Sequence, residues 1–371
     1  MPISADHRSA FALLESEQRV LGLLSLRRLM TQGALVEPMG LTQQSVSRLV
    51  SGLVERGLVT TGARMSEGRR GYPSTAVRLE PGYASALGVS LTSSGVTLAA
   101  IDFAGQVIAE RRHALRPVRI ETVMACVGEA IAEWQAGPPL AGLGVGISGS
   151  FLDDGVRFNT PPYLEEWMGI DVAGAFTERF DLPAWADNDG NVAAIAESVS
   201  GVGRWAPSFA YLYLAAGVGG GVILDRKPWR GRMGNAGEFA GGLPPNIYPF
   251  PSLELLRQLV ARHGPVFESI DELVAAYDPA WPAVDEWVER VRDSLSIIAS
   301  NATAILDLDA IVIGGLAPRD LAERAIARID LFDQRRRAIG RPMAHLVPGE
   351  VGPSATAIGA AMLPLRGLFF R

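Results

Sequence analysis

Cysteine and lysine are almost absent from this chain of 371 residues, which has one of each, Cys126 and Lys227. A single cysteine cannot form an intrachain disulfide, and a cysteine-rich zinc site is excluded as well. Cys126 lies in an apolar helical pattern, and we interpret it as a small buried hydrophobic residue. The sequence also lacks an apolar segment long enough to span a bilayer and the apolar run of a signal peptide. We therefore expect a soluble, cytoplasmic protein.

Basic and acidic residues are nearly balanced in number, but they are unevenly distributed along the chain. The formal net charge is −6, whereas Met1–Glu80 alone carries ten arginines and seven acidic residues, a net charge of +3. A basic first segment on an acidic remainder is typical of a DNA-binding module joined to one that does not bind DNA. The length allows two or three domains, and a hydrophobic fraction of 48% allows a large core.

Residues 1–18 show little pattern, but residues 19–56 show the periodicity of consecutive helices. Apolar residues recur at helical spacing over Arg19–Met30, and Thr31 is expected to cap a short helix that runs to Glu37. Pro38 should end that helix, because its ring and missing N–H oppose continuation. After a tight turn with glycine, a longer helix is expected over Gln43–Arg56, and its first turn is polar.

This order of helix, short turn and helix predicts a helix-turn-helix module, whose second helix enters the major groove. Two expected strands, 58–60 and 76–79, flank an arginine-rich loop, which we interpret as a wing that meets phosphate or the minor groove. The predicted DNA-binding residues are Gln43, Gln44, Ser45, Ser47, Arg48, Arg69 and Arg70. A winged module that docks proteins is the alternative. Only DNA binding should weaken steeply as salt rises.

The remaining residues repeat one order of elements, a hairpin followed by helices and a further strand. The expected strands and helices are 86–91, 96–102, 106–111, 121–135 and 140–147, and then 210–214, 222–224, 285–306 and 310–313. The repetition predicts two α/β lobes with a cleft between them.

A polar group of residues stands between an expected buried strand and an alanine-rich helix, within Ala184–Glu197. Asp187, Asn188 and Asp189 follow the strand directly. In open α/β sheets, ligands lie at the carboxyl ends of strands, and the N-terminus of a helix favours polar or anionic groups. The alternative is that Asn188 or Asp189 only caps the helix.

Taken in order, several motifs of the chain resemble those of the ROK family, whose name joins repressors, open reading frames and sugar kinases. The motifs are GVGISGS (144–150), ADNDGN (186–191), AAGVGGGVILD (215–225), GNAGEFAG (234–241), IVIGGLA (311–317) and ATAIGAAML (355–363). The resemblance implies an actin-like, ribonuclease-H-like pair of lobes. It also implies a winged helix over 1–80 and a two-lobed body over 81–371, with lobes at about 84–200 and 201–371. A winged helix before such a body resembles the repressor branch.

The resemblance also implies which residues bind a sugar. Asp189 stands at the base position of the family kinases, Glu238 matches a sugar-binding glutamate, and Asn188 would bond a second hydroxyl. Asn159 lies near the family's Pro-Asn contact, although a turn residue before prolines is an equal alternative. Since an unpaired carboxylate in a cleft is costly, a sugar hydroxyl is the expected partner of Asp189.

Other positions depart from a working kinase. Ser90 stands where the family kinases carry an aspartate that serves Mg²⁺, and Leu91–Ser94 lacks the paired glycines of their phosphate turn. The zinc histidine of the family would fall at Gly241 and its cysteines within Gly242–Ser252, where the chain has neither residue. We therefore expect no metal, no cofactor and no catalytic residue, with Asp189 as a vestigial base.

The sequence thus predicts a sugar-responsive transcriptional regulator, with repression as the expected mode. Its expected partners are operator DNA, a sugar or sugar phosphate, and at least one further copy of the chain, as a homodimer or a dimer of dimers. Two alternatives stay open. One is an active sugar kinase with a DNA-binding head, and the other is a scaffold that has lost both ligand binding and catalysis.

Overall fold

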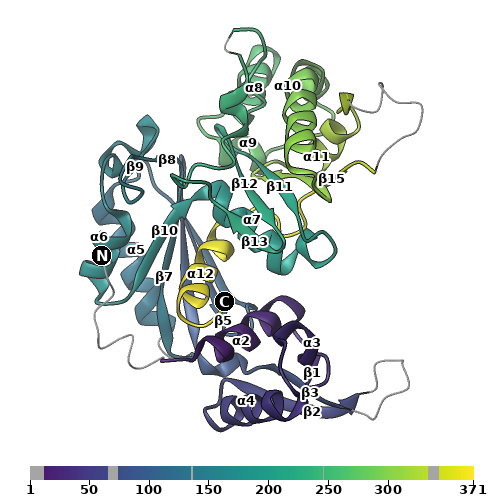
Figure 1. The fold of residues 1–371 in the computed structure, drawn as a ribbon. Helices are drawn as coiled ribbons and strands as arrows, with labels where there is room; N and C mark the ends of the chain where they lie inside the picture. The colour runs from purple at the N-terminus through teal and green to yellow at the C-terminus, as the bar shows by residue number, and fades with distance from the viewer. Residues whose placement is uncertain (1–11, 66–73, 135–136, 245, 333–341) are drawn as a thin grey trace.

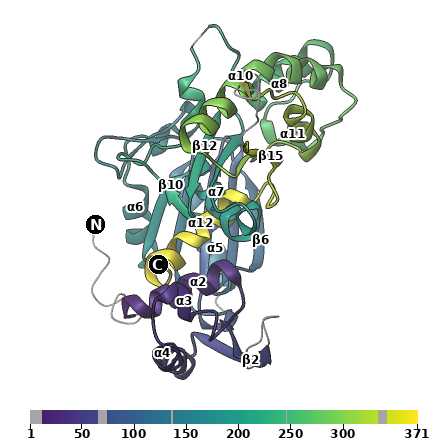
Figure 2. The same cartoon turned by 45° about the vertical axis from the view of Figure 1, so that its right-hand side comes forward.

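The computed structural model of the chain describes residues 12–65, 74–134, 137–244, 246–332 and 342–371, and it consists of three parts (Figure 1). A small head comes first, and two α/β lobes follow, each built on a five-stranded sheet. The head lies beside the last helix of the chain (Figure 2). A cavity of about 360 Å³ is lined by residues of both lobes, so the predicted cleft is confirmed.

The head combines short helices with a small sheet of strand order β1-β3-β2. Its elements are α2 (Glu15–Arg27), β1 (Met30–Thr31), α3 (Val36–Met39), α4 (Gln43–Glu55), β2 (Val59–Met65) and β3 (Ser74–Leu79). The predicted helix, turn, helix and pair of antiparallel strands are therefore confirmed. Arg69 and Arg70, which the sequence places in the wing, lie outside the described residues.

The first helix of the head differs from the prediction at both ends. The carboxylate of Glu17 accepts the N–H of Leu14 at 2.8 Å, which helps the helix to begin four residues before the expected start. Arg28, with a φ of 60°, follows the last helical residue. Met30 pairs with Val77 in the sheet, so the helix expected to reach Met30 is shorter than predicted.

The second helix of the head, in contrast, begins later than predicted. The hydroxyl of Thr31 accepts the N–H of Ala34, which forms a turn before α3 instead of its first helical residues. Pro38 lies inside α3 and does not end it, because N–H groups in the first turn of a helix have no acceptor within the helix. The helix ends at Met39, and Gly40 follows it with a φ of 64°.

The third helix of the head, α4, confirms the prediction closely. Thr42 caps it, since its hydroxyl oxygen accepts the N–H of Ser45 at 3.2 Å. Val46, Val50 and Leu53 are buried on one side of α4. The polar residues of its first turns are therefore left on the opposite side.

The two lobes share one sheet topology, β10-β7-β4-β5-β6 in the first and β15-β14-β11-β12-β13 in the second. In each, an antiparallel meander is extended by two parallel strands. The strands of the first lobe are β4 (Ser85–Thr92), β5 (Gly95–Asp102), β6 (Val107–Ala114), β7 (Leu140–Ile147) and β10 (Ala184–Asn188), with a separate pair of β8 (Ser150–Phe151) and β9 (Phe158–Asn159). Those of the second lobe are β11 (Phe209–Leu214), β12 (Val218–Leu224), β13 (Lys227–Trp229), β14 (Ala310–Gly315) and β15 (His345–Pro348). This repetition confirms the predicted α/β class with paired lobes.

Helices cover the outer face of each sheet, and two further helices fill the space between the sheets. The outer helices are α5 (Ile120–Trp134) and α6 (Val172–Phe180) on the first lobe, and α8 (Leu253–His263), α9 (Ile270–Ala275), α10 (Pro282–Leu306) and α11 (Arg319–Ile326) on the second. The inner helices are α7 (Asp189–Ser200) and α12 (Ala355–Leu368), which pack on each other. No helix among the described residues has the length and apolar composition needed to cross a membrane.

The last helix of the chain, α12, packs on the sheet of the first lobe. A Cβ added at Gly88 of β4 would lie 1.8 Å from the carbonyl oxygen of Ala357. One added at Gly144 of β7 would lie equally close to that of Ala360. Only glycine allows a helix to approach two strands so closely. The last helix of the expected second lobe, 201–371, therefore packs on the sheet of the first lobe, and the lobe boundaries stay a prediction.

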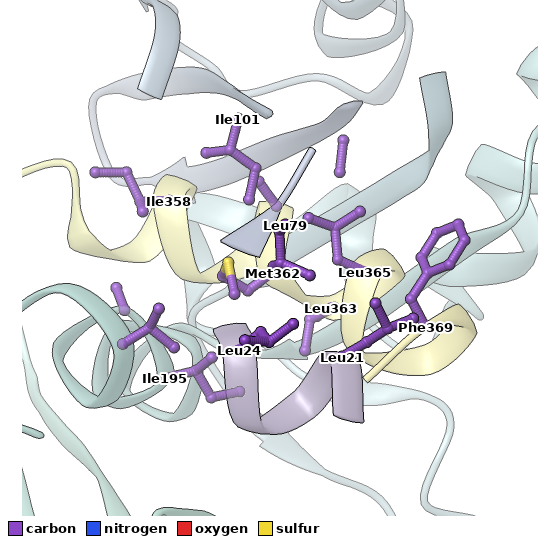
Figure 3. Packing of buried hydrophobic residues seen from close by; sticks show 14 of the residues in the cluster. Leu21, Leu24, Leu79, Ile101, Ile195, Ile358, Met362, Leu363, Leu365 and Phe369 are labelled. Carbon is purple, nitrogen blue, oxygen red and sulfur yellow. The ribbon is translucent and has the colours of Figure 1, made fainter. Parts of the chain in front are cut away.

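The same helix contacts the head (Figure 3). Leu21 and Leu24 of α2 lie in one buried apolar cluster with Leu363, Leu365 and Phe369. These side chains are almost completely buried, so the contact between the head and α12 is part of a continuous hydrophobic core.

Hydrogen bonds reinforce this head–body contact, which consists of α2 and residues 363–371. The backbone N–H of Arg371 donates to the carbonyl oxygen of Gln18 at 3.2 Å, and the side-chain amide of Gln18 donates to the carbonyl oxygen of Leu368. A Cβ added at Gly22 would lie 2.4 Å from the carbonyl oxygen of Arg371. The position of the head thus depends on the end of α12.

Candidate functional site

Asp189 is the first residue of α7 and stands directly after β10, as the sequence predicts. Its side chain is buried, with the residue only 7% exposed. One carboxylate oxygen accepts the hydroxyl of Ser148 at 2.5 Å and the other accepts the N–H of Gly190 at 2.8 Å. Burial raises the pKa of Asp189, and these hydrogen bonds offset part of the rise. A hydroxyl of the protein itself is thus one partner of this carboxylate, and binding of a sugar hydroxyl stays a prediction.

Ser148, Tyr163 and Glu238 surround this carboxylate, and we name these four residues the carboxylate cluster. Tyr163 hydrogen-bonds Ser148, and burial raises the pKa of Tyr163 to about 12. Glu238 is exposed, yet partial burial and then the negative charge of Asp189 raise its pKa. The cluster brings carboxylate acceptors and hydroxyl groups together, which is the chemistry that recognises a polyhydroxylated ligand.

Two members of this cluster, Ser148 and Tyr163, are absent from the sequence prediction. Ser148 follows β7, and β7 pairs with β10 in parallel, with Ile147 opposite Asn188. The carboxyl ends of neighbouring parallel strands lie at the same edge of a sheet. Ser148, in the motif at 144–150, could therefore have been predicted to lie near Asp189. Tyr163 lies in a short 3₁₀ helix over Pro162–Trp167, and no periodicity in the sequence points to it.

Asn188 acts as the cap of α7 in the structure. Its side-chain oxygen accepts the N–H groups of Gly190 and Asn191, and its side-chain nitrogen donates to the carbonyl oxygen of Gly149. These are the bonds of the capping role that the sequence left open as an alternative. Binding of a second ligand hydroxyl by Asn188 stays a prediction. It would use the side-chain amide hydrogen that does not donate to Gly149.

Asn159 lies at the margin of the cluster. It ends β9 and stands opposite Ser150 in the two-stranded pair with β8. Its carbonyl oxygen lies 2.4 Å from the position of a Cβ added at Gly149, so the strand packs tightly on the loop that carries Ser148. The residue is exposed, and its role in binding a ligand stays a prediction.

Asp187 forms a second buried carboxylate beside the first. It is completely buried, and one oxygen accepts the N–H of Asn188 and the side-chain amide of Asn191. The other lies 2.5 Å from a guanidinium nitrogen of Arg230, at an angle that is not that of a hydrogen bond. Burial raises the pKa of Asp187 and Arg230 lowers it. This ion pair joins the loop after β13 to β10, and so links the two lobes.

The cavity between the lobes adjoins the hairpin of β4 and β5. Ser90 and Ser94, from the stretch that departs from the phosphate turn of the kinases, line it from the first lobe. Glu268, Asp271 and Glu272 line it from the second lobe. Arg112 and Arg116 line it as well, so these acidic and arginine side chains carry a formal charge of −1, which disfavours a polyphosphate.

The DNA-binding surface predicted on α4 is accessible. Gln43, Gln44 and Arg48 are exposed, and Ser45 and Ser47 are half-buried. The hydroxyl of Ser45 also hydrogen-bonds that of Thr42 at the start of the helix. Arg78, which the sequence prediction omitted, is exposed on β3, where its Nε donates to the hydroxyl of Thr60.

Acidic, histidine and cysteine side chains do not gather in threes at any place that suits a metal ion, within the part of the chain that the structure describes.

Two regions of the chain match known families. Residues 86–246 match the model of the ROK family, and residues 16–70 match that of the MarR family. Over 361 residues the chain is 30% identical to the protein y4fQ of Sinorhizobium fredii, covering 96% of this chain and 92% of that one. It is 26% identical over 208 residues to the xylose repressor of Caldicellulosiruptor bescii, covering 53% of this chain and 51% of the repressor.

The fold of the whole chain also resembles a solved structure, that of a ROK family transcriptional regulator described as a homologue of the E. coli MLC protein. The TM-score is 0.68 at 18% identity, and the match covers 98% of this chain and 97% of the other. At this identity the similarity concerns the fold, and it extends over the head and both lobes.

Proposed function

This chain belongs to the ROK family and carries a MarR-type winged helix before the ROK body, and on that premise we propose that it is a sugar-responsive transcriptional regulator. We propose repression as its mode, operator DNA as the partner of the head, and a sugar or sugar phosphate as the ligand of the carboxylate cluster. The similarity to the xylose repressor of Caldicellulosiruptor bescii supports both the mode and the ligand class.

The observation that carries the proposal is the position of α12 between the two sites. Near its start, the hydroxyl of Thr356 donates to the backbone oxygen of Asp189 at 3.5 Å. Its other end packs on Leu21 and Leu24 of the head (Figure 3). A ligand that binds one arrangement of the lobes more tightly would therefore bias the position of the head as well.

We propose that the head, residues 1–80, reads DNA with α4, and that residues 81–371 form the ligand-binding body. Gln43, Gln44 and Arg48 are exposed and of the residue types that pair with adenine and guanine. Ser45, Ser47 and the wing arginines complete the proposed surface. A helix-turn-helix protein reads a two-fold operator as a dimer, so we propose a homodimer or a dimer of dimers.

We further propose that the body is not a kinase. Phosphoryl transfer needs backbone groups around the phosphates and a carboxylate for Mg²⁺. Ser90 stands at the position of that carboxylate in the family kinases, and acidic side chains of the second lobe face the same space. Binding of hydroxyls at Asp189 needs none of the missing parts.

A thermal-shift series tests the ligand. D-xylose, D-glucose and glucose 6-phosphate are added to the wild type, to Asp189→Asn and to the control Asp153→Asn, which changes an exposed aspartate. At 100 times its Kd, a ligand of the folded state adds about 2.7 kcal/mol of stability. We expect one of the sugars to raise the melting temperature of the wild type and the control, and of Asp189→Asn much less. No shift with any of them favours the scaffold alternative.

The DNA partner is tested with duplexes that the wild type selects from a random pool. Affinity should fall steeply with salt, and Arg48→Ala should cost about tenfold, the value of one good base contact. Arg290→Ala, on α10 of the second lobe, is the matched control. Affinity that is independent of salt would favour the protein-docking alternative. Transfer of phosphate from ATP and Mg²⁺ to a sugar would favour the kinase.

A further inference from the structure

The cavity between the lobes is a space of its own, distinct from the carboxylate cluster. Its volume of about 360 Å³ is within the range of small-molecule sites. Tyr213 lines it, and the hydroxyl of Tyr213 hydrogen-bonds Thr356, which in turn donates to the backbone of Asp189. Neither Asp189 nor Glu238 is among the described residues that line the cavity.

Hydroxyl groups from β4, β5 and the turn between them line part of the cavity. Ser90, Thr92, Ser94 and Thr97 line it. Ser94 is only 7% exposed, and its hydroxyl has no hydrogen-bond partner among the described residues. Buried polar groups are almost always paired in folded proteins. The hydroxyl of Ser94, at the wall of the cavity, is therefore unusual in having no such partner in the described part of the chain.

Another part of the lining carries charge from α9 and the residues just before it. Glu268, Asp271 and Glu272 line the cavity against Arg112 and Arg116, so the acidic and arginine side chains of its described lining sum to a formal charge of −1. The two groups of charges pair across the lobes, with nitrogen–oxygen distances of 3.3 Å for Arg112–Asp271 and 3.6 Å for Arg116–Glu268 and Arg116–Glu272, so that two arginines share three carboxylates and one negative charge is left over. This balance disfavours an anion and favours a cation.

We propose that this cavity is a second small-molecule site, which takes a hydroxylated ligand carrying a protonated amine and no anionic group, such as an amino sugar. The amine would lie against the carboxylates of α9 and the hydroxyls against Ser94 and its neighbours. Because both lobes line the cavity, its ligand favours the arrangement in which the lobes are together. The proposal does not depend on DNA binding or on the ligand of Asp189.

Calorimetric titration tests it on the Asp189→Asn protein, in which the carboxylate cluster is disabled. The probes form a matched series of D-glucosamine, D-glucose, which lacks the amine, and glucosamine 6-phosphate, which adds an anion. We expect glucosamine to bind most tightly at a mildly acidic pH, where its amine is protonated. Ser94→Ala in that background should weaken glucosamine about fivefold, the value of one hydrogen bond.

Ser94→Ala should also leave the thermal midpoint unchanged, since the folded protein loses no hydrogen bond with that hydroxyl. Asp271→Asn should reduce the preference for glucosamine over glucose. Glu133→Gln is the control and should change neither the affinity for glucosamine nor its preference over glucose. Glu133 pairs with Arg111, which lies on β6 next to Arg112. A loss confined to the cavity variants supports the second site.

Several results would overturn the proposal. They are no glucosamine binding to Asp189→Asn, tighter binding of glucosamine 6-phosphate, and an affinity that neither cavity variant changes. If the wild type binds a sugar while Asp189→Asn binds no glucosamine, the regulator proposal stands and this one fails. If Asp189→Asn weakens glucosamine binding and the cavity variants do not, the carboxylate cluster alone accounts for the binding of glucosamine.

Discussion

The two ends of α12 lie in opposite environments. Its first turn lies beside Asp189, one of two neighbouring carboxylates that burial makes costly to keep charged. Its last turns lie in an apolar cluster with Leu21 and Leu24 of the head. The energy of a buried charge depends strongly on its partners and on pH, whereas an apolar contact depends on neither. The polar end is therefore suited to sensing a ligand, and the apolar end to holding the head in place.

The largest effect on stability is expected near the polar end of α12, from removal of the arginine that pairs with a buried carboxylate. Arg230→Met leaves Asp187 buried without its ion-pair partner, and breaking such a pair costs about 3 kcal/mol of stability. Arg230 lowers the pKa of Asp187, so the variant raises that pKa further. The folded state then binds protons more readily than the unfolded state, and the loss is greatest at high pH and shrinks as pH falls.

Urea unfolding at about pH 7.5 and about pH 5.5 measures both parts of this prediction. Arg232→Met, in the same loop and exposed, is the matched control and should cost little. Adding Asp187→Asn to Arg230→Met should restore most of the stability, because it removes the uncompensated charge. An equal loss at both pH values would show that the ion pair is not the source of the effect.

A smaller effect, of defined sign, is expected at the apolar end. Gly22→Ala places a Cβ 2.4 Å from the carbonyl oxygen of Arg371. Overpacking costs about 1–3 kcal/mol, and the helix preference of alanine returns up to about 1 kcal/mol, so we expect a net loss of about 1 kcal/mol. The head should shift on α12, and the effect of sugar on DNA affinity should weaken.

Gly52→Ala on α4 is the control for this substitution. A Cβ added there meets nothing within 4 Å, so helix preference alone should act and stabilise the protein by up to about 1 kcal/mol. The two variants make the same chemical change in two helices of the head and should move stability in opposite directions. If both stabilise, the head–body contact is loose and α12 does not fix the head.

The sequence predicts what depends on neighbours along the chain, and much less of what depends on packing. Thr42 and the polar turn after it set the start of α4, and the motif at 186–191 sets the junction of β10 and α7. The packing of α12 on the first lobe was not predicted, because the need for glycine at Gly88 and Gly144 becomes visible only when the helix that lies on them is known. Tyr163 and Arg230 reach the site from separate segments, which no periodicity could bring together.

An effect on stability no larger than that of Gly22→Ala, but of opposite sign, is expected from neutralising the ligand-binding carboxylate itself. Asp189→Asn keeps an acceptor for the hydroxyl of Ser148 but removes a buried charge, so at about pH 7.5 we expect a gain of about 1 kcal/mol with loss of sugar binding. Because the pKa of Asp189 is raised, the wild type takes up a proton as pH falls, and the gain should shrink. A variant less stable than the wild type at every pH would mean that the carboxylate is fully compensated. The polar end of α12 would then be as insensitive to ligand and pH as the apolar end.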